Sequence, residues 1–171
     1  LKPNYAEAYN TRGTALRNLR QLNEAIESYK KAIQLKPDLA EAYSNLGLTH
    51  SESGQLEMAM NSHKKALALN PDSADFRWNF SLLQLKTDFL VEGFKNYEAR
   101  WERKKFTSPR RQFSMPRWVG ESLLGKKILI WAEQGIGDEI MFATLIPEFE
   151  KLGGKVGIEC AAKVVEIFQW S

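Results

Sequence analysis

A period of 34 residues constrains this chain more than any other feature of its sequence. Residues 6–39 aligned with residues 40–73 share fifteen identities in 34 positions. A fixed period of this length is typical of solenoids, in which each repeat buries its apolar face against the next one. We therefore expect residues 1–104 to form one helical array: the tail of an earlier repeat, the two full repeats, and a degenerate closing repeat at 74–104.

The residues that recur have the sizes that packed helix pairs require. Gly13 and Gly47 are small where two antiparallel helices must approach closely, and Tyr9, Tyr29 and Tyr43 fill the space between them. Pro37 and Pro71 are expected to end the second helices, because proline lacks the backbone donor that a further turn needs. This length and pattern resemble the tetratricopeptide repeat (TPR). The resemblance implies a mainly α fold, a solenoid of antiparallel helix hairpins.

The closing repeat departs from this pattern. Its helices are predicted near 74–87 and 92–104, but Ser81 stands at the glycine position and no proline follows. We expect its outer face to contact something other than another repeat.

The two histidines and the single cysteine are interpreted as structural. His50 and His63 occupy positions where these repeats usually carry an aromatic side chain, and no carboxylate or thiol lies at ligand spacing. Cys160 has no second cysteine to pair with. No metal site is predicted.

The first helices of such an array line a concave groove in which extended peptides bind. Asn45 and Asn79 lie 34 residues apart and should stack on one face, whereas Thr11 interrupts the pattern in the first repeat. Here the array resembles that of O-linked N-acetylglucosamine transferases, whose asparagine ladder implies a protein or peptide partner held by its backbone. The alternative is that these asparagines are ordinary solvated side chains. The candidate groove residues are Asn10, Thr11, Arg17, Asn45, Trp78 and Asn79.

The remaining sequence has a different composition. Residues 105–125 contain prolines, glycines and basic residues, which predicts a linker that packs on the surface through its aromatic residues. Residues 126–171 follow the order β-α-β-α, typical of the start of a Rossmann-like unit. The unbroken apolar run at 127–132 predicts a strand covered on both faces, as in parallel sheets. The open edges of so short a sheet predict a mobile tail, packing against the TPR end, or self-association between copies.

A glycine turn joins the first predicted strand to the following helix. Gly135 and Gly137 form a candidate anion-facing turn, although the third glycine of the dinucleotide-binding fingerprint is missing. The run 131–138 resembles the N-terminal domain of heptosyltransferase-like glycosyltransferases, especially bacterial proteins in which TPRs precede that domain. The resemblance implies a nucleotide sugar for the full-length parent, no cofactor in this fragment, and Asp138 as an acceptor-side base. Alternatively, Asp138 simply caps its helix.

Three function classes follow from these features. We expect a protein- or peptide-binding scaffold that has no enzyme activity as this fragment. The alternative is a glycosyltransferase whose acceptor-side domain begins at residue 126. A weaker alternative is anion or nucleic-acid binding through the basic segment 95–117, although a net charge of only +3 argues against nucleic acid. The chain has neither an apolar run of roughly 20 residues nor a signal peptide, so the predicted location is the cytoplasm.

Overall fold

The fold is taken from a computed structural model. It describes residues 5–108, 111–131, 133, 144–160 and 165. The chain forms two compact units, residues 1–106 and residues 107–171, and each is described by itself.

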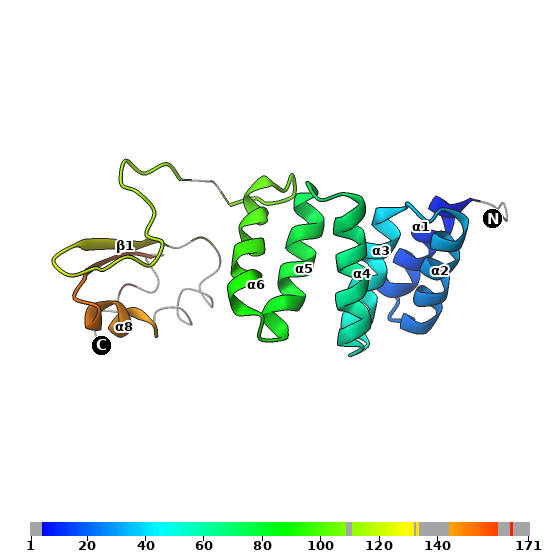
Figure 1. Cartoon of the computed structure of the whole chain (residues 1–171), viewed down its shortest axis with the longest axis horizontal. Coiled ribbons are helices and arrows are strands. Elements are labelled where there is room, and N and C mark those ends of the chain that lie inside the picture. The colour runs from blue at the N-terminus through cyan, green and yellow to red at the C-terminus, as the bar shows by residue number, and fades with distance from the viewer. Residues whose placement is uncertain (1–4, 109–110, 132, 134–143, 161–164, 166–171) are drawn as a thin grey trace. The chain divides into compact units, whose positions relative to one another are not determined.

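The first unit is an array of three helical hairpins (Figure 1). The helices of each hairpin pack against each other, and each second helix packs on the first helix of the next hairpin. The first helices also contact one another, because α1 touches α3 and α3 touches α5. The helices are α1 (Ala6–Asn18), α2 (Leu22–Leu35), α3 (Ala40–Glu52), α4 (Leu56–Leu69), α5 (Ala74–Lys86) and α6 (Leu90–Tyr97).

Two glycines allow the hairpins to close, as the sequence predicted. A Cβ on Gly13 would lie 2.6 Å from Cε1 of Tyr29, and a Cβ on Gly47 would lie 2.9 Å from the ring of His63. Both rings are buried, so any larger residue would force the two helices apart. The prediction that His63 occupies an aromatic core position is confirmed.

The ends of the helices also repeat. Helices α2 and α4 both end two residues before a proline, as predicted for Pro37 and Pro71. The turn inside each hairpin contains one residue in the left-handed conformation: Arg20 (φ 62°), Gly54 (φ 78°) and Asp88 (φ 61°). These three residues are 34 apart, so the turn geometry is set by the hairpin and not by glycine alone.

The closing hairpin differs from the predicted ranges in its second helix. This helix begins at Leu90 and ends at Tyr97, and the chain continues as a 3-10 helix, η1 (Glu98–Glu102). Arg100 occupies the position that alanine has in the other two repeats. Its guanidinium lies 4.7 Å from the ring centroid of Tyr97 and 4.8 Å from that of Trp101. Arg100 is 8% exposed, so a long cationic side chain is packed where the other repeats have a small one.

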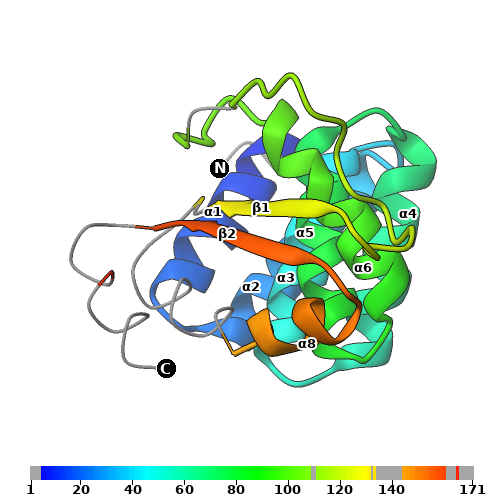
Figure 2. The ribbon, with the colours of Figure 1, turned by 90° about the vertical axis from the view of Figure 1, so that its left-hand side faces the viewer.

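The second unit contains a small parallel sheet (Figure 2). Strands β1 (Lys127–Trp131) and β2 (Lys155–Glu159) pair in parallel, with Ile128 opposite Val156, and α8 (Ile146–Lys151) precedes β2. The expectation of a strand covered on both faces is wrong for the described part of the chain. No described residue of either strand is buried, and 38% of Leu129 and 40% of Ile158 remain exposed. The structure describes the helix predicted at 139–152 only from residue 144 onward, where α8 covers Ile146–Lys151, and the helix predicted at 161–170 lies outside the described residues apart from residue 165.

The linker packs on the second unit through aromatic side chains. Phe113 contacts the ring of Trp131 with centroids 5.8 Å apart, and Trp118 meets Phe149 edge to face at 5.5 Å. Leu123 is only 3% exposed. Apolar side chains of the linker therefore cover part of this small sheet and its helix.

Candidate functional site

The candidate site is the row of polar side chains on the first helices of the three hairpins. These side chains recur at helical spacing along α1, α3 and α5, so each helix presents one stripe and the stripes lie side by side. We call this surface the first-helix face. It consists of Glu7, Asn10, Thr14 and Arg17 on α1, Glu41, Ser44, Asn45, Leu48 and Glu52 on α3, and Asp75, Trp78, Asn79 and Leu82 on α5.

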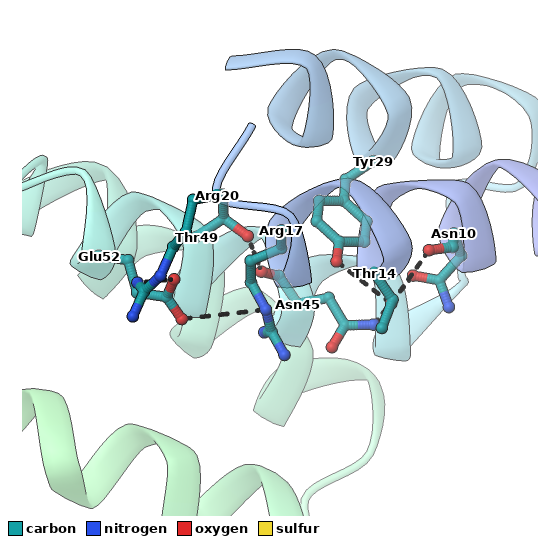
Figure 3. Close-up of polar contacts among 8 residues, drawn as sticks. All are labelled: Asn10, Thr14, Arg17, Arg20, Tyr29, Asn45, Thr49 and Glu52. Carbon is teal, nitrogen blue, oxygen red and sulfur yellow. Dashed lines mark hydrogen bonds and ion pairs between the residues drawn. The ribbon is translucent and has the colours of Figure 1, made fainter. Parts of the chain in front are cut away.

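The asparagines form a staggered ladder across the helices. Nδ2 of Asn45 donates a hydrogen bond to Oδ1 of Asn10 (3.0 Å), as Figure 3 shows, and Nδ2 of Asn79 donates to Oγ of Ser44 (3.1 Å). Each amide thus bonds to a residue 35 positions earlier, whereas the sequence predicted a stack at intervals of 34. The Oδ1 atoms of Asn45 and Asn79 have no hydrogen-bond partner among the described residues. These oxygens can accept hydrogen bonds from a ligand.

Further hydrogen bonds connect Asn10, the first residue of the ladder, to the core of its hairpin. Oη of Tyr29 donates to Oγ1 of Thr14 (3.2 Å), and Thr14 donates in turn to the carbonyl oxygen of Asn10 (3.2 Å). Burial raises the pKa of the Tyr29 hydroxyl above its usual value, so it keeps its proton at neutral pH. These bonds hold Thr14 between Tyr29 and the backbone of Asn10, and the side chain of Asn10, which is 9% exposed, accepts from Asn45.

Two other predicted groove residues have different surroundings. Thr11 is exposed and donates to the carbonyl of Glu7 in its own helix, so it does not extend the ladder. Arg17 lies against α3, with Nε 3.9 Å from Oε1 of Glu52, and Arg20 approaches the same carboxylate at 3.3 Å (Figure 3). Within the described structure, Nη1 of Arg17 is buried without a hydrogen-bond partner. This end of the face carries positive charge that Glu52 only partly balances.

Trp78 marks the other end of the face, and Arg103 covers it. The guanidinium of Arg103 lies 3.7 Å from a ring centroid of Trp78, and its Nε donates to Oδ1 of Asp75 (2.6 Å). Arg103 belongs to the basic segment, and its contact with Trp78 was not predicted from the sequence. The signal was present, because a carboxylate and a tryptophan three residues apart on one helix form a binding site for a cation.

Three arginines of the basic segment form ion pairs within the molecule. Arg100 pairs with Glu98 at 2.8 Å, Arg103 pairs with Asp75, and Arg111 pairs with Glu159. Each of these three pairs lies within one unit, which leaves less charge for an anionic partner. The exposed lysines of the segment are Lys95, Lys104 and Lys105.

The predicted catalytic and anion-facing residues lie outside the described residues. These are Gly135, Gly137 and Asp138. In the part of the chain that the structure describes, no group of His, Cys, Asp or Glu side chains could hold a metal ion. No described helix is long and apolar enough to cross a membrane.

The fold and the first-helix face define a helical-repeat scaffold of the class that binds other proteins. The repeats themselves are tetratricopeptide repeats. Residues 13–54 match a family model described as TPR repeat, and residues 40–73 match one described as Tetratricopeptide repeat.

Known proteins are similar to part of this chain. Protein FlbA of Caulobacter vibrioides is 37% identical over 81 residues, which are 46% of this chain and 14% of FlbA. A crystal structure of MamA is 25% identical with a TM-score of 0.54, and the match covers 60% of each chain. The MamA RS-1 ArsTM double mutant is 23% identical with a TM-score of 0.53, covering 59% of this chain and 57% of that one. The chain thus spans only a small part of FlbA and less than two thirds of the MamA structures.

Proposed function

We propose that the first-helix face binds an extended segment of a partner protein, chiefly through the partner's backbone. The staggered ladder carries this proposal. The Nδ2 atoms of Asn45 and Asn79 donate hydrogen bonds within the array. Their Oδ1 atoms can still accept hydrogen bonds from a peptide. An extended peptide presents backbone N–H groups at regular intervals and can donate to both oxygens whatever its side chains are.

The ladder also prepares the site for binding. Because each amide is fixed by a bond to the preceding hairpin, its oxygen has a defined direction before the peptide arrives. A preorganised acceptor loses little side-chain entropy on binding, which favours affinity. The half-buried position of Asn45 and Asn79 further shields their hydrogen bonds from water.

The test is a titration of fluorescein-labelled ten-residue peptides of mixed sequence, followed by fluorescence anisotropy. Replacing Asn45 or Asn79 by alanine should weaken binding about fivefold in each case. This factor corresponds to about 1 kcal/mol, the usual contribution of one hydrogen bond. The matched control is Asn61→Ala, an exposed asparagine on the second helix α4. Circular dichroism must show equal helix content in all variants. Unchanged affinity in both Asn45→Ala and Asn79→Ala, or no peptide binding by the unmodified protein, refutes the proposal.

We also propose, as a second candidate function, that the second unit contributes to a glycosyltransferase-like domain with a nucleotide sugar as donor. The parallel pairing of β1 with β2 favours it, since parallel strands are typical of Rossmann-like domains. On this proposal Asp138 is the acceptor-side base. The chain itself should not transfer sugar, and measurable transfer from a radiolabelled nucleotide sugar by the purified chain would contradict that expectation.

A further inference from the structure

The three hairpins carry equivalent carboxylates at the start of their first helices, and two of these carboxylates already bind a cation. Glu7, Glu41 and Asp75 are 34 residues apart, and each is the second residue of its helix. Oε1 of Glu7 lies 2.9 Å from Nζ of Lys36, and Oδ1 of Asp75 lies 2.6 Å from Nε of Arg103. In each case the cation lies at the end of the repeat that begins with the carboxylate.

The middle hairpin lacks the corresponding cation. The residues equivalent to Arg103 and Lys36 are Leu69 and Asn70, and neither carries charge. Glu41 is exposed and has no ion pair among the described residues. The equivalent carboxylate thus binds a lysine in the first hairpin and an arginine in the third. In the middle hairpin no described cation pairs with it.

Glu41 also lies on the surface to which a peptide would bind. It precedes Asn45 by four residues on α3, so the two side chains are neighbours on one stripe of the helix. A peptide that donates to the Asn45 oxygen passes within reach of the carboxylate. A lysine or arginine side chain has the length and charge to complete the missing pair.

We propose that Glu41 determines the specificity of the first-helix face and selects peptides that carry lysine or arginine. This inference rests on the proposed peptide-binding function and specifies its partner as a basic segment. The neighbouring cations on Glu7 and Asp75 restrict the selection to one position, since those two carboxylates are already neutralised within the array.

The experiment uses three labelled ten-residue libraries that are identical except for one fixed central residue: lysine, glutamine or glutamate. The unmodified protein should bind the lysine library three- to fivefold more tightly than the glutamine library, as expected for an exposed ion pair at low salt. Glu41→Gln should remove this preference, and Glu41→Lys should transfer it to the glutamate library.

Glu57→Lys is the matched control. Glu57 is exposed and is the second residue of α4, the second helix of its hairpin, so it does not lie on the first-helix face. Its replacement by lysine changes the net charge by the same amount as Glu41→Lys. It should keep the preference for lysine. Equal binding of all three libraries by the unmodified protein, or a lysine preference that survives Glu41→Lys, overturns the selection by Glu41 and leaves the peptide-binding function intact. Failure of every library to bind overturns both proposals.

Discussion

His63 should make the stability of the array depend on pH. Its side chain is 1% exposed, packs against Phe80 with ring centroids 5.8 Å apart, and lies against the backbone of Gly47. Both ring nitrogens are buried and lack a hydrogen-bond partner in the described structure. Burial lowers the pKa of His63 from 6.5 to about 4, because the charged ring would lose its hydration without gaining a partner.

The sign and size of the effect follow from linkage. The folded pKa lies below the unfolded one, so this contribution to stability is complete above pH 6.5 and is lost as the pH falls from 6.5 toward 4. The difference corresponds to about 3 kcal/mol when fully expressed and to about 2 kcal/mol at pH 5. For an array of this size, 2 kcal/mol lowers the melting temperature by about 10 °C.

The assay is thermal and urea unfolding followed by circular dichroism at 222 nm, at pH 7.5 and pH 5. His63→Phe should remove most of the loss at pH 5 and should raise stability at pH 7.5 by about 1 kcal/mol, since two unpaired polar atoms leave the core. His50→Gln is the comparison: burial lowers the pKa of His50 as well, but its ring has a partner in Gln55 at 2.6 Å, so this variant should remove a smaller part of the loss at pH 5. An equal loss of stability between the two pH values in His63→Phe and the unmodified protein would refute the role of His63.

Two further predictions concern packing. Gly13→Ala should destabilise the array by about 1–3 kcal/mol in urea titrations, because its Cβ would lie 2.6 Å from the Tyr29 ring; unchanged stability would contradict this geometry. Arg103→Ala should cost about 1 kcal/mol through the lost contact with Trp78 and the lost ion pair, whereas Lys104→Ala at the neighbouring exposed position should have no effect. Equal unfolding midpoints for the two variants would show that the stacked arginine contributes nothing.

The repeats could be predicted because their packing is local and occurs more than once. In the first two hairpins a glycine meets a large ring, Gly13 with Tyr29 and Gly47 with His63, and the recurring glycine is visible in the sequence. The prolines that follow the second helices end those helices within one turn of the chain. Such constraints need no knowledge of distant residues, so spacing alone reveals them.

The second unit was harder to predict. The apolar run at 127–131 indicated a strand, and its parallel partner was found at 155–159. The extent of burial depends instead on what covers the sheet, which a short apolar run does not specify. The candidate residue Asp138 lies outside the described residues, so its role stays a prediction.

The period, the hairpins and the face on which Asn45 and Asn79 lie follow from the order of the residues. Which side chains meet across that face depends on how the hairpins pack. Asn79 bonds to Ser44, which lies 35 residues earlier, and not to Asn45. The contact of Arg103 with Trp78 likewise joins two residues of one repeat that lie far apart in sequence. Contacts between hairpins depend on angles and distances that no spacing within one repeat can encode.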